Sequence, residues 1–278
     1  MAIQTSGPYE LRKLGIGGVL DQAIRIVRDN LKPLLIIVSP MLVFAILNGL
    51  LAVYLFPAGD PSTLTADQIA ANQSANLTQG AIYGAIGTAI TLLLIPWVNG
   101  SLIHFVSQRY LGHEITATAA MARGWKRYWP LFWTQLLYIA VVTFGFILLI
   151  IPGIFFIYWY LLSYQVAVIE RLSGYAAMKR AKQLVKGSLS QLFLLMLVLT
   201  VFNFLLGAGA GFIPDLNIRV AVSGVLGQVL GLVSLAALVV FYFSCRCKVE
   251  NYDLEHLAAE MAGRDSDLPS DGEPPRAA

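Results

Sequence analysis

The longest hydrophobic stretch of the chain lies between Arg127 and Glu170, where 42 consecutive residues include no Asp, Glu, Lys or Arg. As one helix this stretch would be roughly 60 Å long, about twice the hydrocarbon thickness of a bilayer. It is therefore expected to fold back on itself. Pro152 and Gly153 mark the place, because proline removes a backbone donor and disfavours helical geometry in the residue before it, while glycine tolerates a turn.

The uncharged stretches of the chain predict six spans, each of about 17–25 residues, which is the length that crossing a bilayer requires. The spans cover residues 34–56, 81–106, 131–150, 153–169, 190–212 and 220–244. Residues 57–79 are rich in Pro, Ser, Thr, Asn and Gln and are expected to form a loop. The pattern thus predicts an all-α, polytopic membrane helical bundle in which six transmembrane helices pair as three hairpins.

A short amphipathic segment precedes each hairpin, at residues 16–31, 117–129 and 175–188. In the first, apolar side chains recur every three or four residues on one face of the expected helix, and Gln22 falls on the other face with the charged residues. The apolar face comprises Ile16, Leu20, Ala23, Ile24, Val27 and Leu31. We expect three cytoplasmic interfacial helices with their apolar sides towards lipid and their cations towards anionic headgroups. The alternative is that they serve only as basic anchors that fix the orientation of the chain.

The segments at the two ends differ from the rest of the chain. The six-helix membrane domain is expected to cover residues 14–257. Residues 1–13 form a polar N-terminal segment without the apolar core of a removable signal peptide. Residues 258–278 are polar and Pro-rich and are expected to be a disordered cytoplasmic tail.

Charge is scarce and unevenly distributed. Charged residues make up 13% of the chain, against about 25% in an ordinary soluble domain, and apolar residues make up 57%. Eighteen of the 19 Lys and Arg residues lie before the first span, between spans two and three, between spans four and five, or after the sixth. Only Arg219 lies on the opposite side. Because positively charged connections remain in the cytoplasm, both ends of the chain are expected there.

This asymmetry, together with spans that lack charged residues, leads us to expect a non-enzymatic module that engages anionic lipid or membrane-protein partners at the cytoplasmic leaflet. Membrane lipids are the expected partners, with other membrane proteins or a second copy of the chain as further ones, and no nucleic acid. The alternative is a channel or carrier for a lipid-like or uncharged solute, motivated by Pro40 and Pro96 inside spans one and two and by neutral polar residues. The candidate polar path comprises Asn48, Asn99, Gln165 and Asn203. Such side chains more often form hydrogen bonds between helices.

Three local patterns, taken together, resemble a known family. They are LGIGGVLDQA at 14–23, then IIPGI at 150–154 with AAMKRA at 176–181, and FYFSCRCKVE at 241–250. The chain resembles the membrane domain of bacterial glycerophosphodiester phosphodiesterases and the related YciC-like integral membrane proteins. The resemblance implies a multi-pass protein of the bacterial cytoplasmic (inner) membrane. The catalytic barrel of the enzymes needs about 250 residues, for which this chain has no room, so their activity is not expected here.

No arrangement of residues for catalysis or metal binding stands out. His104, His113 and His256 accompany none of the sequence motifs of hydrolases, zinc proteases or nucleotide-binding loops. We therefore expect no enzymatic activity and no cofactor. Cys245 and Cys247 depart from the family pattern and are spaced for a metal pair or for acylation, but thiols are the simpler expectation in a reducing cytoplasm.

Glu170 lies where the fourth span meets the cytoplasm, and a carboxylate among apolar neighbours needs a partner. We expect an ion pair with Arg180 or Arg127, in a cluster with Lys179 that holds the third amphipathic helix in place. The alternative is that this cluster binds a lipid phosphate, because arginine geometry suits phosphate oxygens.

Small residues recur at helical spacing in the spans and permit close approach of helix backbones. The candidate close-packing positions are Gly84, Gly224, Gly227 and Gly231. We expect tight packing within the monomer at these positions, with a dimer interface as the alternative.

Overall fold

The computed structural model describes residues 9, 13–55, 66–212 and 216–250. Within these ranges the chain is helical and contains no strand. Six stretches are long and apolar enough to cross a membrane, which confirms the predicted fold class and makes the chain a multi-pass membrane protein. They are Leu31–Asn48, Gly80–Tyr110, Tyr128–Leu148, Ile150–Ile169, Leu189–Gly209 and Leu226–Glu250. The predicted C-terminal tail and most of the predicted N-terminal segment lie outside the described residues.

Short helices precede the three hairpins, which are α2–α3, α5–α6 and α9–α10. In chain order the helices are α1 (Ile16–Asp29), α2 (Leu31–Leu55), α3 (Ala66–Tyr110), α4 (Ala117–Lys126), α5 (Tyr128–Leu148), α6 (Ile150–Tyr160), α7 (Ser163–Ile169), α8 (Gly174–Val185), α9 (Leu189–Ala210) and α10 (Leu216–Glu250). The short helices α1, α4 and α8 correspond to the three predicted amphipathic segments.

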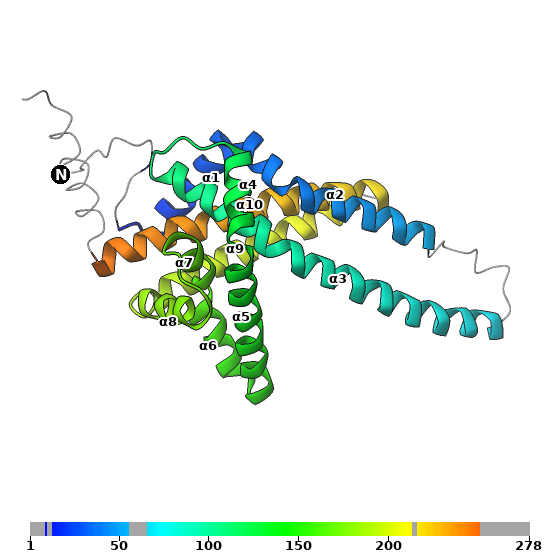
Figure 1. The fold of residues 1–278 in the computed structure, drawn as a ribbon. Helices are drawn as coiled ribbons and strands as arrows, with labels where there is room; N and C mark the ends of the chain where they lie inside the picture. Colours follow the sequence, from blue (N-terminus) through cyan, green and yellow to red (C-terminus); the bar gives the residue numbers. More distant parts are fainter. Residues whose placement is uncertain (1–8, 10–12, 56–65, 213–215, 251–278) are drawn as a thin grey trace, which may run out of the picture.

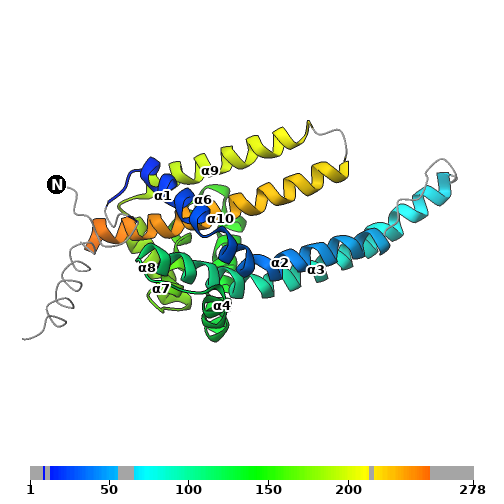
Figure 2. The same ribbon diagram turned by 90° about the horizontal axis from the view of Figure 1, so that it is seen from above.

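The three hairpins diverge from a common hub, which consists of α1, α4, α7, α8 and the adjoining ends of the hairpins (Figure 1). In Figure 1 α2–α3 extends to the right and α5–α6 extends downward, and Figure 2 shows α9–α10 diverging from α2–α3. The largest fully buried side chains lie in the hub and include Ile26, Phe105, Tyr110, Leu184 and Tyr242. The hairpin tips are exposed, and Ile147 and Phe212 reach 76% and 88% exposure. Exposed apolar side chains along the hairpins suit contact with lipid tails.

The short helices bury their apolar faces against other helices of the hub, so the expectation that these faces lie towards lipid was wrong. α1 packs on α10, α4 on α3, and α8 on α5 and α7. The predicted apolar face of α1 is rotated in the structure, because α10 covers the side that includes Val19, Gln22 and Ile26, whereas Ile24 is exposed. The expectation that Gln22 faces away from the apolar side was therefore wrong.

The second hairpin turns at Leu149, which is extended at φ −168° and ψ 151° and separates α5 from α6. The turn lies three residues before Pro152, which instead occupies the first turn of α6, where a helix does not need its N–H. A Cβ built on Gly145 would lie 3.0 Å from the Cα of Gly153. Gly153 thus permits a close contact across the hairpin and does not form the turn, so the predicted position was wrong.

Two further boundaries differ from the prediction. The fourth span is interrupted, because α6 ends at Tyr160 and α7 begins at Ser163. α3 begins at Ala66, so part of the predicted loop 57–79 is helical. The helical part of this segment lacks Gly and Pro and contains several alanines. Alanine favours a helix even where the sequence is polar.

α2 and α3 continue through Pro40 and Pro96, and side chains compensate for the backbone donors that these prolines lack. Near Pro40 the hydroxyl of Ser39 donates to a backbone carbonyl of the preceding turn at 2.8 Å. The carbonyl of Leu92, four residues before Pro96, accepts a hydrogen bond from the amide of Gln135 on α5 at 3.5 Å. Helix contacts therefore account for prolines inside the spans.

Candidate functional site

α4 crosses α3 at Gly124, where the two helices lie very close together. A Cβ built on Gly124 would lie 2.1 Å from the Oγ of Ser101 and 2.9 Å from the carbonyl oxygen of Trp97, so a side chain does not fit. The indole N–H of Trp97 donates to the carbonyl of Met121 at 3.1 Å and fixes the same part of α4. This crossing places Arg123, in the last turn of α4, beside α3.

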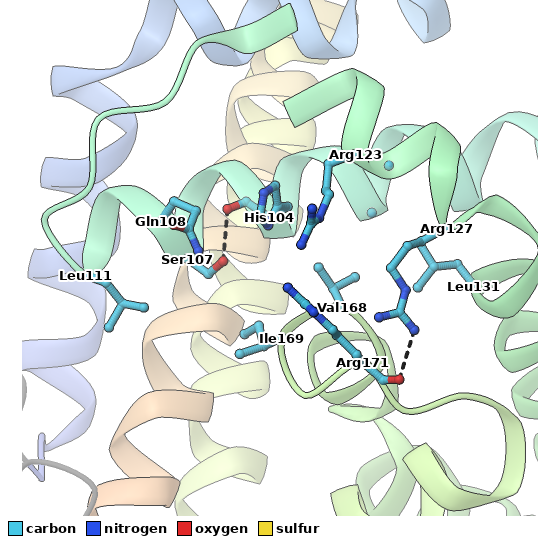
Figure 3. Close-up of a pocket in the computed structure, with 12 residues that line it drawn as sticks. His104, Ser107, Gln108, Leu111, Arg123, Arg127, Leu131, Val168, Ile169 and Arg171 are labelled. Carbon is cyan, nitrogen blue, oxygen red and sulfur yellow. Dashed lines mark hydrogen bonds between the residues drawn. The ribbon is translucent and has the colours of Figure 1, made fainter. Parts of the chain in front are cut away.

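A cavity of about 360 Å³ lies beside this crossing, between α3, the junction of α4 with α5, and the end of α7 (Figure 3). Its volume falls within the range of small-molecule pockets, about 300–1,000 Å³. The polar lining residues are His104, Ser107, Gln108, Arg123, Arg127 and Arg171. The apolar lining includes Leu131, Val168 and Ile169. Figure 3 shows the three arginines reaching towards the same space from separate segments of the chain.

Arg171 lies in the loop between α7 and α8 with a left-handed backbone, at φ 58°. A residue other than glycine adopts this conformation at a cost of about 1–2 kcal/mol, so the surrounding structure must hold it. The Nη2 of Arg127 donates to the carbonyl of Arg171 at 2.9 Å. The N–H of Gly174, at φ 56°, donates to the Oγ1 of Thr134 at 2.8 Å. These two hydrogen bonds join both ends of the loop to the region of α5.

The three arginines of the cavity have no acidic partner among the described residues. Within the described ranges, none of the ion pairs involves Arg123, Arg127 or Arg171. Burial, followed by the positive charges of Arg171 and Arg123, lowers the pKa of Arg127 from its ordinary value. Guanidinium groups nevertheless stay protonated in proteins. The cavity therefore combines three positive charges with no compensating carboxylate, an arrangement that favours an anion.

Glu170 belongs to a separate network that is internally compensated. The Nε of Arg180 and the hydroxyl of Tyr242 each donate to its carboxylate at 2.8 Å. Arg180 also pairs with Glu250, whose other oxygen accepts from the Nε of Arg246 at 2.9 Å. Burial alone would lower the pKa of Arg180, but the hydrogen bonds to Glu170 and Glu250 raise it overall. This network connects α8 with the end of α7 and with α10.

The structure thus divides the predicted cluster between two places. Glu170 pairs with Arg180, one of the two partners considered, and the pair holds α8 in the hub. Arg127 lines the arginine cavity. Lys179 is exposed on α8 and belongs neither to this cavity nor to the network of Glu170. The sequence did not predict the arginine cavity, and it did not indicate that Arg123 and Arg171 line a site.

The four residues of the candidate polar path are not connected by hydrogen bonds in the described part of the chain. Asn48 accepts from the hydroxyl of Tyr83 within the α2–α3 hairpin. Asn203 donates to a carbonyl of its own helix at 2.8 Å. Gln165 is buried in the hub and Asn99 is half-buried in α3. None of the four lines the arginine cavity.

The candidate close-packing glycines lie apart from the close helix contacts. Gly84, Gly227 and Gly231 are exposed, and a Cβ built on any of them would meet nothing within 4 Å. The expected packing within the monomer is therefore not found at these three positions, because the hairpins diverge there. The surroundings of Gly224 lie outside the described residues. Close approaches occur instead in the hub, at Gly124, and in the second hairpin, at Gly145 and Gly153.

The remaining candidates for chemistry are the two cysteines and possible metal ligands. Cys245 and Cys247 are buried thiols of α10 that form no disulfide within the described ranges. Among the described residues, no group of three His, Cys, Asp or Glu side chains could hold a metal ion. No family model, curated protein or solved structure matches the chain.

Proposed function

We propose that the protein is a non-enzymatic membrane module that binds the phosphate groups of anionic lipids at the cytoplasmic leaflet. The observation that carries the proposal is the cavity in which Arg123, Arg127 and Arg171 gather without a carboxylate. Guanidinium groups present planar pairs of N–H donors that match phosphate oxygens and remain charged. A bound phosphate would neutralise charges that the fold leaves uncompensated.

The aromatic residues around the cavity suit the depth of lipid headgroups. Trp125 and Trp129, on either side of Arg127 in the sequence, are 64% and 66% exposed. Tryptophan side chains gather at the boundary between lipid tails and headgroups. This supports a position of the α4–α5 junction at the level of the lipid phosphates.

The distribution of charge supports the proposed orientation. The helices of the hub and their connections carry the basic residues, whereas Arg219 alone among the Lys and Arg residues lies near the tip of a hairpin. We place the hub and both ends of the chain in the cytoplasm, at the bacterial inner membrane that the family resemblance implies. Anionic lipids of the cytoplasmic leaflet would then face the cavity.

The variant Arg123→Gln tests the proposal, with Lys126→Gln as its matched control. Both side chains are exposed cations in the last turn of α4, but only Arg123 lines the cavity. The full chain in nonionic detergent is titrated by calorimetry with short-chain phosphatidylglycerol and, separately, with phosphatidylcholine. Loss of one charged hydrogen bond, worth about 1.5 kcal/mol, predicts about tenfold weaker binding of phosphatidylglycerol to Arg123→Gln and little change for Lys126→Gln.

Two results would contradict the proposal. The first is equal binding of phosphatidylglycerol and phosphatidylcholine to the unaltered chain. The second is an equal loss of affinity in the two variants, which would mean that surface charge in general, and not the cavity, attracts the lipid.

A further inference from the structure

We infer that the arginine cavity selects a phosphomonoester, a terminal phosphate with two negative charges and three free oxygens, over the phosphodiester that most lipid headgroups contain. This inference rests on the proposed function, because it names the ligand class of the same site. The ligand chemistry is shared by a lipid with a terminal phosphate and by a small soluble phosphate ester, and the two sources are distinguished by the experiment below.

The first argument is the number of uncompensated charges. Arg123, Arg127 and Arg171 contribute three positive charges, and none of them forms an ion pair in the described structure. A phosphodiester carries one negative charge and would leave two cations facing each other. A phosphomonoester carries about −1.5 to −2 at pH 7, and adjacent cations favour its fully ionised form. The dianion therefore relieves more of the repulsion within the cavity.

The second argument is the number of directions from which the donors approach. Arg123 comes from α4, Arg127 from the junction of α4 with α5, and Arg171 from the loop after α7 (Figure 3). Arg127 donates one N–H to the carbonyl of Arg171, and its remaining N–H donors are available to a ligand. Three guanidiniums, two from neighbouring turns at the end of α4 and one from the loop after α7, match three terminal oxygens better than the two free oxygens of a diester.

The third argument is the absence of any group that would recognise a positively charged headgroup. Apart from the arginines, the polar lining consists of His104, Ser107 and Gln108, and it includes no carboxylate. The hydroxyl of Ser107 already donates to the carbonyl of His104 at 2.9 Å. The ammonium groups of choline or ethanolamine headgroups would therefore meet three cations and no carboxylate among the lining residues. The apolar side chains of Leu131 and Ile169 can instead contact the carbon atoms next to a terminal phosphate.

The experiment compares two short-chain lipids with the same acyl chains, one with a terminal phosphate and one whose phosphate is esterified to a glycerol headgroup. The full chain in nonionic detergent is titrated by calorimetry with dioctanoyl-phosphatidate, a monoester, and with dioctanoyl-phosphatidylglycerol, a diester. We expect phosphatidate to bind at least about tenfold more tightly. The preference should shrink in Arg171→Gln and persist in Lys179→Gln, because Lys179 is an exposed cation that does not line the cavity. Inorganic phosphate is then added as a competitor.

The outcomes separate this inference from the proposed function. Equal affinities for the two lipids, both reduced in Arg171→Gln, would overturn the monoester preference and leave the anionic-lipid site in place. Affinities no higher than that for dioctanoyl-phosphatidylcholine would overturn both. Where the preference is found, displacement by inorganic phosphate supports a soluble phosphate ester as the ligand, and resistance to displacement supports a lipid.

Discussion

At the scale of single residues, Arg171 combines backbone strain with an uncompensated charge. Its left-handed conformation at φ 58° is one that glycine would adopt without cost, yet the position carries a guanidinium that lines the cavity. The hydrogen bond from Arg127 to its carbonyl holds this conformation. Strained residues are concentrated at functional sites, where the surrounding structure compensates for their cost. The strain therefore agrees with a binding role for this loop.

Replacing Arg171 with glycine should separate the effect of backbone strain on stability from the effect of the charge on lipid binding. The free energy of unfolding should stay the same or rise by up to about 1 kcal/mol, because glycine fits the left-handed backbone. Binding of phosphatidylglycerol should weaken by about tenfold, because one guanidinium is lost. Thermal unfolding in detergent and calorimetric titration measure the two effects on the same sample.

The converse control is Gly174→Ala in the same loop. Gly174 is at φ 56° and carries no charge, so alanine should lower the free energy of unfolding by about 1 kcal/mol while the lipid affinity is retained. Unchanged lipid binding by Arg171→Gly would mean that this residue does not contact the anion.

At the scale of elements, α4 determines where two of the three arginines lie. Gly124 lets α4 approach α3, and alanine there would place a Cβ 2.1 Å from the Oγ of Ser101. Gly124→Ala should therefore push α4 outward, lower the free energy of unfolding by about 1–3 kcal/mol, and weaken anion binding because Arg123 and Arg127 move with the helix. Gly84→Ala is the matched control, since its Cβ would meet nothing within 4 Å.

Thermal unfolding and lipid titration of the two glycine variants provide the test. Gly84→Ala should leave both properties close to those of the unaltered chain. If Gly124→Ala lowered stability but bound phosphatidylglycerol normally, the position of α4 would not control the site.

The elements that could be predicted from the sequence are those that depend on local patterns. The second amphipathic segment was predicted at 117–129 and α4 covers Ala117–Lys126, because helical periodicity and charge spacing are visible along the chain. The turn at Leu149 could not be placed in this way. Its position depends on the contact of Gly145 with Gly153 across the hairpin, which only the folded chain reveals.

The arginine cavity was not predictable, because it joins distant segments. Arg127 and Arg171 are 44 positions apart and meet only after α5 has packed on α7 and α8. The local signal was limited to Arg123 and Arg127, which are four positions apart near a helix end and so share one face. The pairing of Glu170 with Arg180 was easier to anticipate, because ten positions separate them and a carboxylate at the end of a span needs a cation.

At the scale of the whole molecule, a packed hub carries three divergent apolar hairpins. The buried side chains lie in the hub, whereas the tips expose residues such as Phe212. This distribution is consistent with a chain that positions its binding site with protein contacts and exposes the spans of its hairpins to lipid. In the proposed orientation, the hub that joins all three hairpins faces the cytoplasm.

Labelling of single cysteines tests the orientation. The variants are Lys179→Cys on the hub and Phe212→Cys near a hairpin tip, and both positions are exposed. Cys245 and Cys247 are buried, so the background labelling of the unaltered chain should be low. A membrane-impermeant maleimide added to intact cells should label Phe212→Cys and should label Lys179→Cys only after the membrane is opened. The reverse result would place the hub outside the cytoplasm.

The most direct measurement is an experimental structure of the full chain in lipid nanodiscs that contain phosphatidate. The account predicts density for a phosphate group within ion-pair distance of Arg123, Arg127 and Arg171, with the same cavity empty of that density in nanodiscs of phosphatidylcholine alone. A carboxylate of the chain itself in contact with the three arginines, or lipid phosphates bound only elsewhere on the hub, would contradict it.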